Sequence, residues 1–273
     1  MIKDITLGQF FPGRSLLHKM DPRMKIVITV LFIAVIFIAK TLWSLLAISL
    51  FTVVFIILGR IPLRIIWRSI KPLWFIIIFT SLINVFLGRE GTLLFEWQFI
   101  KIYSGGLLMA LFISVRIILL IMATSVLLSY TTSPISVTDG IESLLMPLSK
   151  IKVPVHDFAM MLTIALRFIP ILIEETDKII NAQKARGADF ETGSLVKKAK
   201  ALIPVFIPLF VSSIRHADDL ATAMECRCYS GGKGRTRMNT LKMRYYDIIM
   251  LAVTLIFGAG VIFINIYAGG FGI

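Results

Sequence analysis

The sequence predicts an all-α polytopic membrane protein with about five transmembrane helices and a cytoplasmic region of long helices inserted before the last span. Composition is the first observation behind this prediction: 57% of the 273 residues are hydrophobic, 16% are charged, and the mean hydropathy is +0.87. Soluble domains average about a quarter charged residues. The chain therefore belongs in lipid, which excludes a free cytosolic enzyme, a disordered chain and a secreted disulfide scaffold.

The charge balance is the second observation. The chain has 29 Lys and Arg against 16 Asp and Glu, a formal net charge of +13. In a membrane protein this excess indicates cytoplasmic loops under the positive-inside bias, and we expect no binding to nucleic acid. Residues 1–25 include basic side chains but no apolar run, so we expect no cleavable signal peptide. The first span then has to act as its own insertion signal.

Five apolar segments are expected to cross the bilayer. They are residues 26–39, 42–58, 73–87, 105–130 and 246–267. The first two are separated at Lys40, because one unbroken helix of about 33 residues would be near 50 Å long and the hydrocarbon core is about 30 Å thick. The first three segments are short, so we expect these helices to be tilted or partly sheltered. Tyrosines at both ends of the last segment would anchor it at the two interfaces.

Charges in the loops predict the orientation. One loop carries four basic residues without an acidic neighbour: Arg60, Arg64, Arg68 and Lys71. The next loop, residues 88–104, balances its basic and acidic residues, so the first loop is expected in the cytoplasm and the second outside. Counting spans from there places the N-terminus inside and the C-terminus outside. The chain is thus divided into an N-terminal segment with four spans (1–131), a cytoplasmic helical region (132–244) and a last span (245–273).

The region 132–244 alternates apolar and charged stretches. Its apolar parts, residues 158–173 and 202–214, are too short and too interrupted by proline to be confident spans. We expect long helices in or below the inner interface, with re-entrant or additional spans left open. The first helix is expected to begin near Pro154, to continue through Pro170 with a kink, and to stop at Gly187 as a C-cap.

Two segments of this region resemble each other. An offset of 41 residues aligns Asp177 with Asp218 and the tripeptide 185–187 with 226–228. The two tripeptides are Ala185, Arg186 and Gly187, and Cys226, Arg227 and Cys228. Small neighbours leave a guanidinium exposed, able to enter a groove on a partner and to form several hydrogen bonds there, as a hot-spot residue does. The alternative is that each Arg only complements a helix dipole. The matched copies favour docking to two similar subunits, as a pair of ATPases would offer.

Several longer motifs extend over nearly the whole chain. They are the segment 15–25 (SLLHKMDPRMK), residues 146–148 (MPL), residues 166–170 (LRFIP) followed by Glu174 and Glu175, residues 182–187 (AQKARG), and residues 217–229 (ADDLATAMECRCY). Together they resemble the transmembrane T component of energy-coupling factor (ECF) transporters, the family that includes CbiQ-type subunits. The second arginine motif departs from the family pattern, because Cys stands where Ala and Gly are frequent.

The resemblance implies a non-catalytic subunit of an ATP-driven importer in the prokaryotic cell membrane. Two ABC-type ATPase subunits would dock on the two arginine motifs of a coupling region, which we equate with residues 132–244. Further candidates in that region are Arg167, Pro170, Glu174, Asp218 and Glu225. ATP and Mg would be bound by the ATPases, and no cofactor by this chain. A membrane-embedded S component carrying a vitamin or a metal ion would contact the apolar parts of the coupling helices and the N-terminal spans.

Other polar residues have weaker functional interpretations. Cys226 and Cys228 are expected to be small neighbours of Arg227 rather than metal ligands, because zinc takes four ligands and the three histidines are scattered. Arg116 lies within the fourth span, where it is either functional or a donor to backbone carbonyls of the short helices. The N-terminal motif residues are expected to form a polar cluster that holds this segment to the coupling region: His18, Asp21, Pro22 and Arg23. The basic loop 231–236 lacks the spacing of a phosphate-binding loop.

Three alternatives remain beside the shared T component. The first is a dedicated, CbiQ-like T component of a single cobalt, nickel or biotin importer. The sequence of this chain cannot distinguish a dedicated from a shared T component, because substrate contacts reside in another polypeptide. A stand-alone secondary transporter would need acidic residues or broken helices at mid-membrane, and the interiors of the assigned spans have no Asp or Glu. A membrane-embedded hydrolase would need a constellation such as H-E-x-x-H, which the sequence lacks.

Overall fold

A computed structural model describes residues 11, 13, 15–88, 92–97, 100–190, 194–231 and 241–267. The chain divides between residues 141 and 142, and again between 240 and 241, into two compact units. We call the unit that contains the described residues from 11 to 141 and from 241 to 267 the bundle, and the unit that contains residues 142–231 the crossed-helix unit. Parts of two predicted features lie outside the described residues: Arg89 and Glu90 of loop 88–104, and residues 232–236 of the basic loop with the following Arg237.

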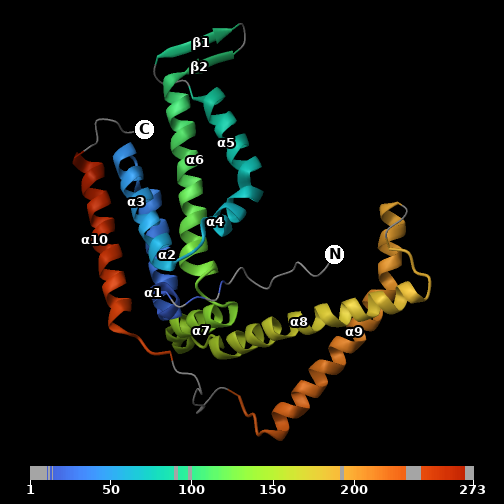
Figure 1. The fold of residues 1–273 in the computed structure, drawn as a ribbon. Helices are drawn as coiled ribbons and strands as arrows, with labels where there is room; N and C mark the ends of the chain where they lie inside the picture. The colour runs from blue at the N-terminus through green and yellow to red at the C-terminus, as the bar shows by residue number, and fades with distance from the viewer. Residues whose placement is uncertain are drawn as a thin grey trace. The chain divides into compact units, whose positions relative to one another are not determined.

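The bundle contains most of the predicted spans. Its elements are α1 (Leu16–Lys19), α2 (Pro22–Ile38), α3 (Leu42–Gly59), α4 (Leu63–Ile70), a 3-10 turn (Lys71–Leu73), α5 (Trp74–Leu87), β1 (Leu93–Trp97), β2 (Ile100–Tyr103), α6 (Ser104–Thr124), a π-helical turn (Ser125–Ser129), the first part of α7 (Pro134–Leu145), and α10 (Tyr245–Tyr267). In Figure 1, α5 lies along α6, and the hairpin β1–β2 joins these two helices at the end opposite α1.

The predicted fold class is confirmed. Within the described residues six helical segments are long and apolar enough to cross a membrane: Leu42–Gly59, Leu63–Leu87, Ser104–Ser129, Val155–Ala185, Val196–Cys226 and Tyr245–Tyr267. The first predicted span corresponds to α2, which has 17 residues. The third is longer than expected, because the basic loop before it is itself helical as α4 and continues into α5. The described part of loop 88–104 forms an antiparallel hairpin that the sequence did not predict.

Aromatic side chains of α2, α3 and α10 form the centre of the bundle. Phe32 is fully buried, and its ring lies 5.5 Å from that of Phe55 in an edge-on arrangement. Phe51 stacks on Phe257 with 4.0 Å between ring centroids. Such ring pairs add to the free energy of burial. The three helices are apolar on almost every side, so each can pack against neighbours on one face and lipid on another.

Side chains satisfy the backbone where α2 ends and α3 begins. Asn265 of α10 donates to the Ile38 carbonyl at 2.8 Å and accepts from the Lys40 amide at 3.2 Å. Thr41 caps α3 by accepting from the Ser44 amide at 3.3 Å. An unpaired backbone group costs several kcal/mol in hydrocarbon, about 2 or more. These polar side chains therefore satisfy the backbone groups exposed at the break between two short helices, α2 and α3, in a place where one continuous helix would be too long for the bilayer.

The crossed-helix unit consists mainly of α8 (Val155–Ala185) and α9 (Leu195–Cys226), preceded by a 3-10 helix (Met146–Ile151). The two long helices cross in Figure 1, and the rings of Phe168 and His216 lie 6.3 Å apart. As predicted, α8 begins after Pro154 and continues through Pro170. Each helix is longer than 30 residues, which makes it an extended, largely uncovered rod.

Candidate functional site

The first arginine motif is the carboxyl-terminal cap of α8. The Ala188 amide donates to the Gln183 carbonyl at 3.0 Å, and the Gly187 amide donates to the Lys184 carbonyl at 2.9 Å. This pair of bonds defines a Schellman motif, in which the residue after the cap needs a positive φ. Gly187 has a φ of 88°, and Arg186 is the cap residue itself. The predicted stop at Gly187 therefore lies one position beyond the cap.

The second arginine motif repeats this geometry at the end of α9. The Tyr229 amide donates to the Met224 carbonyl at 3.0 Å, and the Cys228 amide donates to the Glu225 carbonyl at 2.8 Å. Arg227 is again the cap residue. Cys228 takes the place of the glycine with a φ of 56°, a conformation that a residue with a Cβ adopts only at a cost. Cys in place of Gly at this position therefore strains the backbone, but it leaves the hydrogen-bond pattern of the cap unchanged.

The two arginines share a backbone conformation as well as a cap. Arg186 has φ −86° and ψ 5°, and Arg227 has φ −94° and ψ 18°. Both side chains are exposed, and neither forms a hydrogen bond or an ion pair with another described residue. Their small neighbours in positions 185, 187, 226 and 228 are also exposed. Two equivalent guanidinium groups are therefore presented at two helix ends, which lie apart in this unit (Figure 1).

The second motif is joined to the body of the unit by one side chain. The hydroxyl of Tyr229 donates to Sδ of Met160 on α8 at 2.9 Å. Because Tyr229 lies two residues after the cap residue Arg227, this contact holds the end of α9 against the first half of α8. A movement of this end of α9 would accordingly be transmitted to α8.

The remaining predicted residues of this region lie on the surface of α8 and α9. Arg167, Glu174, Asp218 and Glu225 are all exposed, and the charged groups of these four form no ion pair with a described residue. The unit does contain Lys178 paired with Glu175 at 3.9 Å and His156 paired with Glu142 at 2.9 Å. Pro170 is an exposed residue inside α8. The four unpaired charges are thus available to other molecules.

The two cysteines are exposed free thiols. Within the described residues no group of three or more His, Cys, Asp or Glu side chains is arranged to hold a metal ion. That observation covers part of the chain only, and the absence of a metal site stays a prediction.

The N-terminal motif is attached to the bundle. His18 places Nδ1 2.7 Å from the Ser15 hydroxyl and Nε2 2.9 Å from the Phe11 carbonyl oxygen. Asp21 is the N-cap of α2 and accepts from the Arg23 amide at 2.9 Å, with Pro22 at the first helical position. This combination is a typical helix start. Contact of the motif with the coupling region stays a prediction.

Two buried charges that sequence reasoning missed complete this end of the bundle. Asp247 is fully buried at the start of α10, where it accepts from the Asp21 amide at 3.2 Å and the Arg244 amide at 2.8 Å. Lys25 donates to the Thr131 carbonyl at 2.8 Å and the Thr132 hydroxyl at 3.1 Å. Asp247 was a detectable signal, since an acidic residue at the start of a span is rare. Its contact with Asp21 could not be inferred from the sequence, because the two residues are 226 positions apart in the chain.

Arg116 has the structural role that the sequence left open, that of a donor to a backbone carbonyl of a short helix. Its Nη2 donates to the carbonyl of Ala39, the cap residue after α2, and its guanidinium lies 4.6 Å from the centroid of the Phe112 ring. A cation over an aromatic ring is stabilised where water is excluded. Arg116 thus satisfies a backbone group of a short helix, as Asn265 does.

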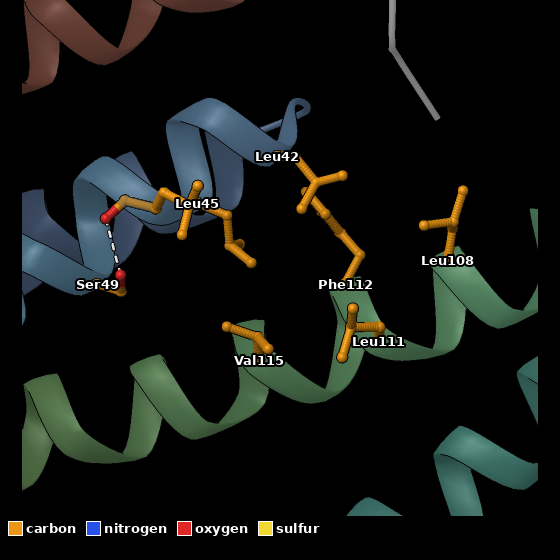
Figure 2. Close-up of a pocket in the computed structure, with 8 residues that line it drawn as sticks. Leu42, Leu45, Ser49, Leu108, Leu111, Phe112 and Val115 are labelled. Atoms are coloured by element: carbon orange, nitrogen blue, oxygen red, sulfur yellow. Dashed lines mark hydrogen bonds between the residues drawn. The ribbon is translucent and has the colours of Figure 1, made fainter.

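A small apolar pocket lies between α3 and α6 beside this residue (Figure 2). Its volume is about 220 Å³, and it is lined by Leu42, Leu45, Leu46, Ser49, Leu108, Leu111, Phe112 and Val115. The single lining hydroxyl, on Ser49, donates to the Leu46 carbonyl at 2.7 Å. The pocket therefore offers an ion or a polar small molecule only the acceptor oxygen of Ser49, and it is not a candidate substrate site.

Comparison with known proteins agrees with the motifs and the fold. The family model described as CbiQ, cobalt transport protein, matches residues 13–238. A protein of Ruminiclostridium cellulolyticum named energy-coupling factor transporter transmembrane protein EcfT is 50% identical over 262 residues, which cover 96% of this chain and 97% of that protein. Proteins with the same name from Clostridium kluyveri and Bacillus subtilis are 51% and 42% identical, over 91% and 97% of this chain and 92% and 100% of their own.

These matches extend along almost the full length of both partners and include both arginine motifs. The chain is therefore a multi-pass membrane protein of the family of energy-coupling factor transporter transmembrane proteins.

Proposed function

We propose that the chain is the scaffold and force-transmitting subunit of an ECF-type importer, and that it binds two ABC-type ATPase subunits through Arg186 and Arg227. The observation that carries this proposal is the equivalence of the two caps: each helix ends in the same Schellman geometry, with an exposed, unpaired arginine as the cap residue. Two equivalent anchors fit two similar partners.

The chemistry of each anchor suits a groove on a folded partner. A guanidinium offers five donors in a rigid plane, and small flanking residues let it enter without obstruction. The Schellman bonds hold the backbone under it, so little order has to be gained on binding. Arginines that act as hot spots contribute about 2 kcal/mol or more each when truncated.

The long helices would transmit the motion. ATP and Mg would be bound and ATP hydrolysed by the ATPases, and closure of the two ATPases would draw the ends of α8 and α9 together. Because these helices cross and are held by Phe168, His216 and the Tyr229 contact, a change at one end alters their mutual angle. Coupling requires that the two states differ in interaction free energy with the partners. Continuous helices of 31 and 32 residues support such a lever.

The partner moved by this lever would be an S component that holds a vitamin or a metal ion in the membrane. Large apolar residues are exposed along both helices: Phe158, Met161, Ile169, Phe206, Ile207 and Phe210. An uncovered apolar surface of this extent indicates contact with lipid or with another membrane protein. The transported substrate would then lie in the S component, which accords with a pocket in this chain whose lining has a single polar side chain, that of Ser49.

The orientation that this function requires follows the charge of the loops. The N-terminus and the coupling region would face the cytoplasm, where ATP is available, and the C-terminus would lie outside.

Co-purification from cells that express the chain and its ATPases tests the docking. Arg186→Glu and Arg227→Glu should each weaken ATPase attachment by about 30-fold or more, and the double variant should lose it, because each replaces a donor by an opposite charge. Membrane insertion should be unchanged in all variants. Arg215→Glu is the matched control, since Arg215 is an exposed arginine of α9 outside the motif. Retention of the ATPases by the double variant would refute the assignment.

A further inference from the structure

Four cations form a stripe on the segment that connects α3 to α5. They are Arg60, Arg64, Arg68 and Lys71, spaced four, four and three residues apart, and all four are exposed. Arg64 and Arg68 lie on one face of α4, Arg60 is the cap of α3 with a left-handed φ of 51°, and Lys71 begins the 3-10 turn after α4. The like charges of Arg64 and Arg68, four residues apart on α4, repel one another, so an external source of negative charge would stabilise this segment.

The chain itself supplies no such charge nearby. Between Asp21 and Glu90 the sequence has no acidic residue. None of the four cations forms a hydrogen bond or an ion pair from its side chain to another described residue. The two neighbouring elements, α3 and α5, are apolar helices without any charge.

The face of α4 opposite the cations packs against the bundle. Ile66 and Ile70 are buried in the bundle core. The hydroxyl of Tyr130, which is itself fully buried, donates to the Ile65 carbonyl at 3.2 Å and contacts the Ser69 hydroxyl. The helix is thus anchored to the end of α6 along one side, and its cationic side is directed away from the core.

A third face of α4 carries the exposed apolar side chains of Leu63 and Trp67, and the exposed Trp74 follows at the start of α5. Tryptophan prefers the headgroup level of a bilayer, where one part of its ring is apolar and the other is polar. A short helix with one buried face, one cationic face and one face with Trp and Leu has the character of a helix at a membrane interface.

We propose that Arg60, Arg64, Arg68 and Lys71 bind the headgroups of anionic phospholipids, with Trp67 and Trp74 at the level of the headgroups. The position of the segment in the chain favours lipid over an acidic protein surface. The apolar helix α3 ends at Gly59, and in the candidate span Leu63–Leu87 every charged residue precedes Trp74, so the residues between Gly59 and Trp74 lie at the edge of the hydrocarbon core. Anionic headgroups are found at that depth and supply the missing charge. The inference is independent of the docking of ATPases.

The two tryptophans of the site can report on its lipids. The chain has four tryptophans, and Trp43→Phe with Trp97→Phe leaves only Trp67 and Trp74. This full-length variant is reconstituted into vesicles of phosphatidylcholine and phosphatidylglycerol, with bromine on the acyl chains of one lipid or of the other. Bromine quenches tryptophan at short range, so the ratio of quenching by the two brominated lipids, at equal mole fraction, measures the local enrichment of phosphatidylglycerol.

We expect phosphatidylglycerol to quench at least about threefold more than phosphatidylcholine, and the ratio to fall towards one in about 0.5 M salt. Replacing the four cations by Gln should bring the ratio to one at low salt. Replacing the three arginines by Lys should keep it, because the interaction depends on charge more than on fork geometry. An unchanged sum of the quenching by the two brominated lipids in the Gln variant would verify that the helix still lies at the same depth.

The matched control removes four exposed lysines from the other unit: Lys150, Lys152, Lys197 and Lys200 are changed to Gln, with the same loss of charge. The control should keep the threefold ratio. Equal quenching by both lipids in the starting variant would overturn the proposal, as would an enrichment that survives removal of the stripe or is lost in the control. A stripe variant that keeps the lipid ratio but loses the ATPases would assign the surface to a protein partner and also overturn it.

Discussion

The bundle and the crossed-helix unit use long apolar helices in opposite ways. In α3 of the bundle, 39% of the most apolar window is buried within the chain, whereas the share is 6% in α8 and 6% in α9. The difference does not come from hydropathy alone, since all three helices are apolar enough to cross a membrane. The shares for the other candidate spans of the bundle are 28%, 22% and 11%, so the bundle helices cover one another to differing degrees, whereas the crossed helices leave almost all of their apolar surface uncovered.

Polar side chains in the two units differ in the same way. In the bundle, Asn265, Lys25 and Asp247 bond to backbone groups of distant segments. In the crossed-helix unit, Arg186, Arg227 and several other charged groups have no partner among the described residues. A polar group that is buried and bonded contributes to the fold, whereas an exposed and unpaired arginine on a rigid cap is available for recognition.

The largest expected effect contrasts two phenylalanines. Phe32→Ala should destabilise the chain by about 3–5 kcal/mol, because the ring is fully buried among other rings of the bundle and its loss leaves a cavity. Phe206→Ala should change the stability by no more than about 0.5 kcal/mol, because that ring is 67% exposed on α9. Denaturant titration in detergent micelles measures both. Similar losses for the two variants would show that α9 is packed as tightly as α2.

An intermediate effect contrasts two arginines. Arg116→Met should cost about 1–3 kcal/mol, because it removes the donor to the Ala39 carbonyl in an apolar environment. Arg167→Met should leave the stability unchanged, because this exposed side chain on α8 bonds to no described residue. Thermal unfolding of both proteins under identical conditions provides the comparison. An Arg116→Met protein as stable as wild type would return Arg116 to the group of functional residues.

The smallest effect concerns the two caps. Cys228→Gly should stabilise the end of α9 by about 1 kcal/mol, because glycine adopts a positive φ without strain, and Gly187→Cys should destabilise the end of α8 by a similar amount. Hydrogen exchange of the Tyr229 and Ala188 amides, which donate the outer Schellman bonds, should slow or quicken about fivefold accordingly. ATPase attachment should survive Cys228→Gly, since Arg227 remains the cap. Unchanged exchange rates in both variants would show that the residue at this position does not strain the cap.

The sequence predicted most of the helices, and the physical reason is local. A run of apolar residues of sufficient length forms a helix in lipid wherever it lies in the chain, because its backbone has no other partner there. The helix from Pro154 to the positive-φ glycine at position 187 was predicted from proline and glycine positions alone and is confirmed. Motif resemblance identified the family, and the relatives confirm it.

The missed features each depend on contacts between distant residues or on conformation. The sequence does not predict the hairpin, because its strands are short, with only five and four residues. The helical state of α4 depends on the burial of Ile66 and Ile70 against the bundle. The positive φ of Cys228 has no sequence signal, because cysteine is not a residue that usually occupies this conformation.

The sequence by itself determined the membrane class, the approximate spans, the pair of arginine motifs and the family, since these depend on composition, local spacing and recurring motifs. Only the tertiary structure decided that Asp247 meets Asp21, that Arg116 serves the end of α2, and that the two motifs are geometrically equivalent caps. The reason is that such contacts are selected by packing and by the cost of burying unpaired polar groups, which no local segment contains.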